Sequence, residues 1–510
     1  MSIAVFCSRI LGLIRDQVMA AFFGTSFVND AFNIGFNIPN LLRRLFGEGA
    51  LSAAFVPIYN EYGLKKGKQF QFDFALNVLS ILSFFLLILT FLGMVFAPFI
   101  VNILYPGLES ETTELAVKLC RIMFPYLFFI GLSSTFIAIL NSHHMFFITG
   151  LSSGLLNIGW ILALLCGVFV LRNDSNDLIF YAAYGVMLGG FLQTIVNLPF
   201  LKKVGYQVKV ILKFKSEAMK SLWQRFLPAM FGLGVREVNL IADAIIASFL
   251  PVGSITALGF ANRLMQLPLG IFGISVGTAV LPEYSRQFTE QRWVDLSETF
   301  KFSVHLILYI LLPISVIMIM GSDVFIRLIF QRGHFDEIAV QMTTIALIFY
   351  SSGLCFYGLN QVIIPLFYAA KDTKTPVKVA ACMVILNIGL SVTLMQFMAH
   401  AGIAFSTALT AIVQFSTLLI LLKKKLPQVK ITNVFFNIIK LSIIIIFLIV
   451  ILWLFNKFII FETNLWFNLL KTILFLTVSF ISLIISFQIL KPEYYKVVSE
   501  KILRKFKTKN

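Results

Sequence analysis

Long apolar runs recur along the whole chain and constrain its fold more than any other feature. Of the 510 residues, 59% are hydrophobic and only 13% are charged, which is not the composition of a soluble globular domain. A helix that crosses a bilayer needs about 20 predominantly apolar residues. The runs predict fourteen membrane-spanning helices, near residues 1–24, 27–60, 73–104, 115–140, 146–171, 177–201, 218–249, 254–282, 300–320, 338–368, 376–398, 402–422, 434–456 and 464–490.

Lysine and arginine are distributed unevenly between the loops that join these runs. Alternate loops, together with the segment 491–510, hold 28 Lys and Arg, whereas the loops between them hold 4. Because positively charged loops stay in the cytoplasm, we expect the lysine-rich side and both termini there. The net charge of +17 then reflects topology and contact with anionic membrane lipids, and nucleic acid is not an expected partner.

A weak internal repeat divides the chain. Three short segments recur in the same order, at offsets of 225, 230 and 221 residues: Ala54–Tyr59 with Ala279–Tyr284, Leu156–Gly159 with Leu386–Gly389, and Leu201–Lys203 with Leu422–Lys424. Six spans separate equivalent segments, so the two halves should have the same orientation. We therefore expect an all-α integral membrane protein with a six-helix lobe at 1–205, a second at 206–425, and two extra helices with a basic cytoplasmic tail at 426–510.

Arginines lie inside runs that otherwise read as membrane helices. An arginine at the centre of a bilayer costs roughly 2.5–3.5 kcal/mol even on the lenient insertion scale, so these side chains must face water, a partner or a ligand. Two interpretations stay open: a cationic cavity for an anionic substrate, or structural arginines that snorkel or pair with carboxylates. Clustering near the N-terminus favours the cavity. The seven residues are Arg9, Arg15, Arg43, Arg44, Arg121, Arg236 and Arg263.

Spacing sorts some of these charges. Arg44 and Glu48 are four residues apart and are expected to pair on a continuous helix, which leaves Arg43 as the better ligand candidate. Arg9 and Arg15 project about 120° apart on a helix, so they should border one broad cavity.

Two further charged positions bear on the same cavity. Asp16 follows Arg15 directly and is expected to face away from it. Asp30 opens the second span, which Pro39 is expected to bend, so this region suits a gate.

Sequence motifs of catalysis and metal binding are missing from the chain. Gly67-Lys68 lacks the glycine spacing of a phosphate-binding loop, and no nucleophile arrangement is visible, so we do not expect an enzyme. His143 and His144 have no acidic or thiol neighbours that would suit a metal site, and the five cysteines lack metal-ligand spacing. Neither a metal nor a cofactor is therefore expected.

A coupling cation such as sodium or a proton remains an open alternative. Asp243 lies in the middle of an apolar run, where an unpaired carboxylate is a functional candidate. The repeat places it in the same lobe as Asn387 and Thr407, whose oxygens would complete a small-cation site. The structural alternative is that Asp243 pairs with Arg236, about two turns away.

The motifs of the chain resemble the MviN/MurJ family of lipid II flippases, within the multidrug/oligosaccharidyl-lipid/polysaccharide exporter superfamily. The resemblance covers nearly the whole chain, and its early motif is specific. The segments that carry it are Ser8-Arg9-Ile10-Leu11-Gly12-Leu13-Ile14-Arg15-Asp16, Asp30-Ala31-Phe32, Pro39-Asn40-Leu41-Leu42-Arg43-Arg44-Leu45-Phe46-Gly47-Glu48-Gly49-Ala50, Ala54-Phe55-Val56-Pro57, Asn262-Arg263-Leu264-Met265-Gln266-Leu267-Pro268 and Lys371-Asp372-Thr373-Lys374-Thr375-Pro376.

This resemblance implies export of undecaprenyl-diphosphate-linked peptidoglycan precursor across the bacterial inner membrane by alternating access. It also implies fourteen helices, a cationic central cavity, a groove for the lipid tail beside the last two helices, and proteins of cell-wall synthesis as candidate partners. The residues implied to bind substrate are Arg9, Arg15, Arg43 and Arg263, and those implied to act at a gate or as structural charges are Asp30, Arg44, Glu48 and Asn262. Asn262 stands where some members carry an acid, so an arginine–carboxylate latch is not expected there.

Three alternatives remain at this point. One is cation-coupled multidrug export, for which an acidic cavity would be better suited than arginines. Another is export of a different lipid-linked oligosaccharide, and the third is a cell-envelope scaffold that transports nothing.

Overall fold

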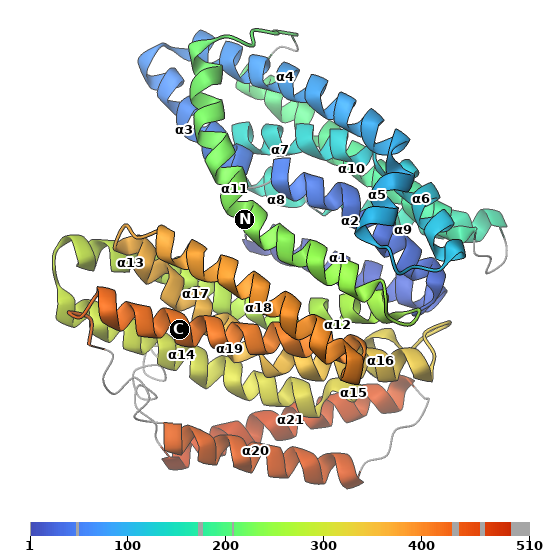
Figure 1. Ribbon diagram of the computed structural model, residues 1–510, viewed down its shortest axis with the longest axis vertical. Coiled ribbons are helices and arrows are strands. Elements are labelled where there is room, and N and C mark those ends of the chain that lie inside the picture. Colours follow the sequence, from blue (N-terminus) through green and yellow to red (C-terminus); the bar gives the residue numbers. More distant parts are fainter. Residues whose placement is uncertain are drawn as a thin grey trace, which may run out of the picture. The chain divides into compact units, whose positions relative to one another are not determined.

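The computed structural model describes residues 2–46, 50–152, 154–171, 177–206, 209–430, 438–458 and 465–490, and across these ranges it contains helices and no strands (Figure 1). This agrees with the all-α fold class predicted from the apolar runs. The helices are α1 Ser2–Phe23, α2 Phe27–Phe46, α3 Ala50–Lys65, α4 Lys68–Val95, α5 Ala97–Leu104, α6 Ser110–Met123, α7 Tyr126–Ser142, α8 Phe146–Ser152, α9 Leu155–Leu171, α10 Leu178–Val204, α11 Glu217–Ala247, α12 Ser254–Pro268, the π-helix η1 Leu269–Gly273, α13 Ile274–Thr289, α14 Trp293–Met320, α15 Ser322–Phe330, α16 Glu337–Ser352, α17 Leu354–Ala369, α18 Lys374–Met398, α19 His400–Lys425, α20 Ile438–Phe458 and α21 Leu465–Leu490.

Ten helical segments of the described chain are long and apolar enough to cross a membrane, or eleven if the bent pair α6–α7 forms one span. Three of the fourteen predicted spans do not reach this standard, and they correspond to α1, to α2 with α3, and to α11. Each of these segments carries charged residues, and α3 is only 16 residues long. The count of fourteen therefore stays a prediction that depends on the charged helices.

Packing divides the chain into two compact units, Met1–Thr256 with Arg332–Phe335, and Ala257–Gln331 with Asp336–Asn510. Helix α11 belongs to the first unit because it packs on α3 and α2. The boundary by packing thus differs from the expected lobe boundary at 205/206, which rests on sequence repetition. The repeat division stays a prediction.

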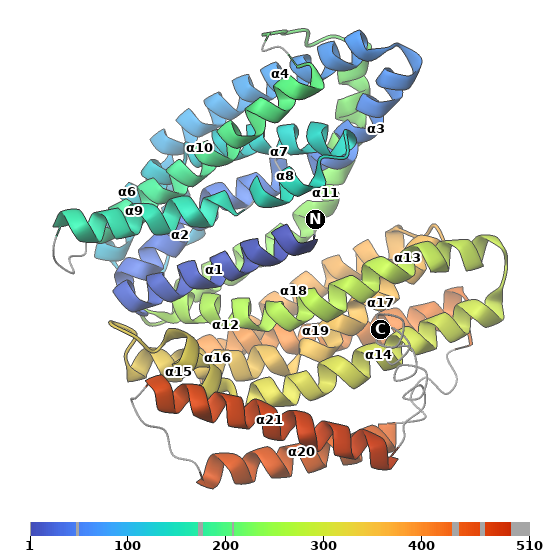
Figure 2. The ribbon, with the colours of Figure 1, turned by 180° about the vertical axis from the view of Figure 1, so that it is seen from behind.

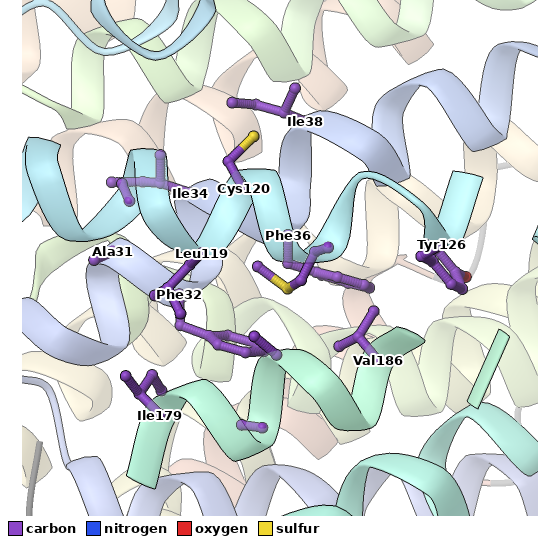
Figure 3. Packing of buried hydrophobic residues seen from close by; sticks show 14 of the residues in the cluster. Ala31, Phe32, Ile34, Phe36, Ile38, Leu119, Cys120, Tyr126, Ile179 and Val186 are labelled. Atoms are coloured by element: carbon purple, nitrogen blue, oxygen red, sulfur yellow. The ribbon is translucent and has the colours of Figure 1, made fainter. Parts of the chain in front are cut away.

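Helix α2 runs through the hydrophobic core of the first unit. Phe32 and Phe36 are buried one turn apart on α2, and both rings contact Trp160 of α9, with centroids 4.8 and 5.4 Å away. Cys120 of α6 lies in the same cluster as a buried thiol, consistent with its reading as a small apolar side chain. Figure 3 shows Phe32 and Phe36 among side chains from α6 and α10.

The second unit has its main core between α14, α17 and α19, where Phe300, Leu311, Leu359 and Phe415 are buried. Helices α20 and α21 pack on each other, and they contact α14 and α15 (Figure 2). Phe475 of α21 is fully buried at this junction. The last two helices are therefore an added hairpin on the second unit.

Three glycines with positive φ interlock the turns of the first unit. Gly24, Gly253 and Gly333 have φ values of 53°, 88° and 55°. A Cβ atom on any of them would lie 2.2–2.3 Å from a facing backbone carbonyl oxygen, far inside van der Waals contact. The facing oxygens belong to His334, Thr25 and Ala21, respectively. These positions need glycine both for backbone conformation and for space.

Replacing Gly24 or Gly333 by alanine should therefore lower the unfolding temperature of the purified protein. Backbone strain contributes roughly 1–2 kcal/mol, and overpacking adds about 1–3 kcal/mol. Gly205→Ala is the matched control, because φ is 102° there but the nearest side-chain atom is 3.4 Å from the added Cβ. Equal losses for Gly24→Ala and Gly205→Ala would contradict the interlocking of the turns.

Candidate functional site

Arg15 of α1 is buried within a set of partners from its own helix and from α9. Its Nε and Nη2 donate to Oδ1 of Asp16 at 3.1 and 2.8 Å, and Nη1 donates to Oδ1 of Asn157 at 2.9 Å. The guanidinium carbon lies 4.3 Å from the centroid of the Trp160 ring, a cation–π geometry. Arg15 is only 7% exposed, so these contacts replace water around a desolvated charge.

The expectation that Asp16 faces away from Arg15 is wrong. Neighbouring residues on a helix do point in different directions, but the long arginine side chain curls back to the carboxylate. Both groups are almost fully buried. In such surroundings an ion pair that also makes hydrogen bonds is the arrangement that avoids an isolated buried charge.

Arg9 occupies the same helix in a different environment. It is exposed, in contrast to Arg15. The preceding backbone carbonyl, that of Ser8, accepts a hydrogen bond of 3.1 Å from Nδ2 of Asn157. Asn157 therefore bonds α1 at two points, beside Arg9 and at Arg15.

Arg43 and Arg44 lie at the end of α2, both half-buried. Arg43 Nε donates to Asn40 Oδ1 at 2.8 Å. Arg44 Nη1 lies 3.4 Å from Oε2 of Glu237 on α11, a carboxylate whose side chain is 8% exposed. The predicted partner of Arg44, Glu48, lies outside the described residues.

A cavity of about 110 Å³ adjoins Arg44 in the first unit, between α2, α5 and α11. Its walls are mostly aliphatic, and polar groups at Arg44, Asn37 and Tyr105 interrupt them. The lining residues are Asn37, Ile38, Leu41, Arg44, Leu104, Tyr105, Leu240, Ile241 and Ala244.

Asp30 holds the first turn of α12. Its Oδ2 accepts from the Gly253 backbone N–H at 2.6 Å, while Oδ1 accepts from the backbone N–H and the hydroxyl of Thr256 at 2.9 and 2.6 Å. A carboxylate at a helix N-terminus satisfies orphan N–H groups and opposes the positive end of the helix dipole. Asp30 therefore caps the start of α12; its predicted role, as part of a gate or as a structural charge, stays a prediction.

Arg263 and Asn262 lie further along α12, within the second unit. Both are half-buried. Asn262 Oδ1 accepts a hydrogen bond from Nε2 of Gln266, one turn along the same helix.

The residues of the predicted cation site are divided between the two units. Asp243 Oδ2 accepts from Asn239 Nδ2 at 3.1 Å on α11, in the first unit. In the second unit, Asn387 donates to Ser406 and Thr407 donates to its own helix backbone. By packing, Asp243 therefore does not share a unit with Asn387 and Thr407, although the predicted cation site assumed that all three lie in one lobe. The cation site stays a prediction. The side chain of Arg236 lies outside those described.

The motif Lys371–Pro376 forms the loop that enters α18. Asp372 accepts hydrogen bonds from the backbone N–H and hydroxyl of Thr375 at 3.0 and 2.6 Å, and Lys425 Nζ lies 2.6 Å away. The bond from Lys425, followed by those from Thr375, holds the pKa of Asp372 at about 2. The motif therefore ties the start of α18 to the end of α19.

Sequence reasoning missed three residues of this region: Asn157, Trp160 and Glu237. Asn157 lies in the repeated segment Leu156–Gly159, and recurrence alone does not mark an asparagine as the partner of a charge. Glu237 is a carboxylate inside an apolar run, the same signal that singled out Asp243. Trp160 gave no signal, because a tryptophan in an apolar helix is usually a packing residue.

At least ten of the described helical segments are long and apolar enough to cross a membrane, and the less apolar helices α1, α2 and α11 carry paired charges. These are features of a membrane transporter. The sequence model described as lipid II flippase MurJ matches residues 19–475. The chain therefore belongs to the MurJ lipid II flippase family.

Individual relatives agree with this assignment. The chain is 35% identical to a probable lipid II flippase MurJ of Buchnera aphidicola subsp. Acyrthosiphon pisum, over 85% of this chain and 83% of that protein. It is 32% identical to the lipid II flippase MurJ of Burkholderia cenocepacia, over 82% and 81%, respectively.

Solved structures show the same relationship. A lipid II flippase MurJ in an inward closed conformation aligns with a TM-score of 0.79 at 28% identity, covering 96% of this chain and 99% of that chain. An inward-facing multidrug resistance MATE family transporter aligns with a TM-score of 0.68 at 13% identity, covering 84% and 96%. The second likeness shows the fold alone.

The Arg44–Glu237 pair predicts non-additive mutations. Arg44→Gln and Glu237→Gln should each lower the free energy of unfolding, whereas the double variant should lose less than their sum. The expected coupling is about 1–2 kcal/mol, because the Glu237 carboxylate is almost fully buried. The exposed pair Arg286–Glu283 is the control and should couple by less than about 0.5 kcal/mol. Additive losses at Arg44 and Glu237 would show that the contact contributes nothing to stability.

Proposed function

We propose that this chain moves lipid II, an anionic lipid-linked peptidoglycan precursor, from the inner to the outer leaflet of the bacterial inner membrane. One observation carries the proposal: the first two helices of a lipid II flippase family member hold four arginines, Arg9 and Arg15 on α1 and Arg43 and Arg44 on α2. Guanidinium groups bind phosphate oxygens through paired N–H donors. The diphosphate of the precursor is the part of the substrate that suits them.

In this proposal Arg9, Arg15, Arg43 and Arg263 bind the diphosphate. Arg9 is exposed and Arg43 and Arg263 are half-buried, so none of these three residues is fully enclosed by the protein. Arg15 contributes the N–H groups that its protein partners leave unused. Asp30, Arg44, Glu48 and Asn262 serve the gate and the helix junctions around the site.

The negative charge of the substrate supports export without ATP. Moving about two negative charges outward through an inside-negative potential of ~100 mV is favourable by roughly 4–5 kcal/mol. A coupling cation at Asp243, Asn387 and Thr407 remains an alternative driver. We further propose that both termini are cytoplasmic, that the basic loops contact anionic lipids, and that the chain has no catalytic activity of its own.

The alternatives fit the molecule less well. A cationic drug would be repelled by the net positive charge of α1 and α2. A scaffold without transport has no need of charged side chains inside membrane helices, which are expensive to maintain. The names of the relatives likewise favour lipid II over another lipid-linked oligosaccharide.

Depletion of the protein in its own cells tests the proposal. Lipid II should accumulate in the inner leaflet, and a wild-type copy should restore growth. Alanine at Arg9, Arg15, Arg43 or Arg263 should abolish this rescue with normal protein levels, and lysine should restore it only weakly, because an ammonium lacks the planar fork. Arg286→Ala, at an exposed position of α13, is the control and should rescue fully.

Two results would contradict the proposed function. Depletion without accumulation of lipid II would remove the transport role. Normal growth with three of the four alanine variants would remove the arginines from the substrate site.

A further inference from the structure

We propose that Asn157 and Trp160 of α9 are positioning residues that fix the direction of the Arg15 guanidinium for the substrate's diphosphate. The inference rests on the proposed function and deepens it. Neither residue is placed in contact with substrate. Each acts through Arg15, one by a hydrogen bond and the other by the face of its ring.

The donors of Arg15 are divided between its protein partners and a ligand. A guanidinium carries five N–H groups. The Nε group and one Nη2 group donate to Asp16, and one Nη1 group donates to Asn157. One N–H on each terminal nitrogen is left for another acceptor. Because Asp16 neutralises the charge of Arg15, the direction of these two donors matters more than net attraction.

Trp160 sets the plane of the guanidinium. The indole is 2% exposed, and the rings of Phe32 and Phe36 lie against it at 4.8 and 5.4 Å. A ring fixed in this way cannot move with the arginine side chain. The guanidinium, 4.3 Å from the ring centroid, is therefore held over a rigid surface that attracts its positive charge.

Asn157 sets the rotation of the guanidinium within that plane. Its Oδ1 accepts from Arg15 while its Nδ2 donates to the Ser8 carbonyl at 3.1 Å. The amide is thus held at both ends, so it presents its oxygen to Arg15 and its nitrogen to the backbone. The bond to the Ser8 carbonyl also fixes the backbone of α1 next to Arg9. The same asparagine therefore constrains the backbone at Arg9 and the side chain of Arg15.

The second copy of the repeated segment shows that this use of asparagine is particular to the first. Asn387 occupies the position equivalent to Asn157, yet it donates to Ser406 of the neighbouring helix α19 at 3.4 Å. Asn157 instead reaches α1, which precedes it by 149 residues at Ser8 and by 142 at Arg15. Both copies therefore carry an asparagine at this position, but only Asn157, in the first copy, is hydrogen-bonded to an arginine.

Fluorinated tryptophans at position 160 test the cation–π contact without changing the size of the ring appreciably. Each added fluorine weakens the negative face of the indole. The rate of lipid II movement across reconstituted vesicles should fall stepwise from mono- to trifluoro-tryptophan, roughly tenfold in all. A residue that only fills space would show no such series.

Trp453 of α20 provides the matched control. It is 54% exposed and has a lysine, Lys457, 5.3 Å from its ring centroid. The same fluorinated series there should leave transport unchanged. Trp160→Phe, which keeps an aromatic face, should retain most of the transport rate, whereas Trp160→Leu and Asn157→Leu should each lose roughly tenfold at unchanged protein levels.

The outcomes separate this inference from the function on which it rests. Transport by the wild type with a flat fluorination series at position 160 would overturn the positioning role and leave the flippase function intact. Failure of the wild type to move lipid II at all would overturn the function itself.

Discussion

The need to pair charged groups that are removed from water shapes the first unit. Charges inside apolar helices are stable only with partners of good geometry. Arg15 has Asp16, Asn157 and Trp160, and Asp30 accepts three hydrogen bonds at the start of α12. The most polar parts of the unit are consequently among its most constrained.

These partners also determine which helices lie together. Asn157 ties α9 to α1, and Glu237 ties α11 to α2. The interlocked glycine turns add a steric constraint at Gly24, Gly253 and Gly333. The helices that carry the proposed substrate arginines are therefore fixed by specific contacts, as a site that recognises a phosphate geometry requires.

Periodicity and composition predicted the features that depend on residues close together in the sequence. Apolar runs gave the helical membrane fold, and the arginines of α1 and α2 stood out because charge is rare in such runs. The orientation of Asp16 was misjudged because a side chain longer than one helical turn can return to its neighbour. Asn157, Trp160 and Glu237 were missed because their partners are distant in sequence, and the helix α11 joined the first unit through packing that no local pattern encodes.

The central claim is that guanidinium groups in the membrane helices recognise the diphosphate of lipid II. The most direct test compares the affinity of the purified protein for lipid II with its affinity for an analogue in which a neutral linker of equal length replaces the diphosphate. Loss of several charge-assisted hydrogen bonds predicts binding weakened at least about a hundredfold. Equal affinity for both lipids would show that the arginines do not bind the diphosphate and would contradict the account.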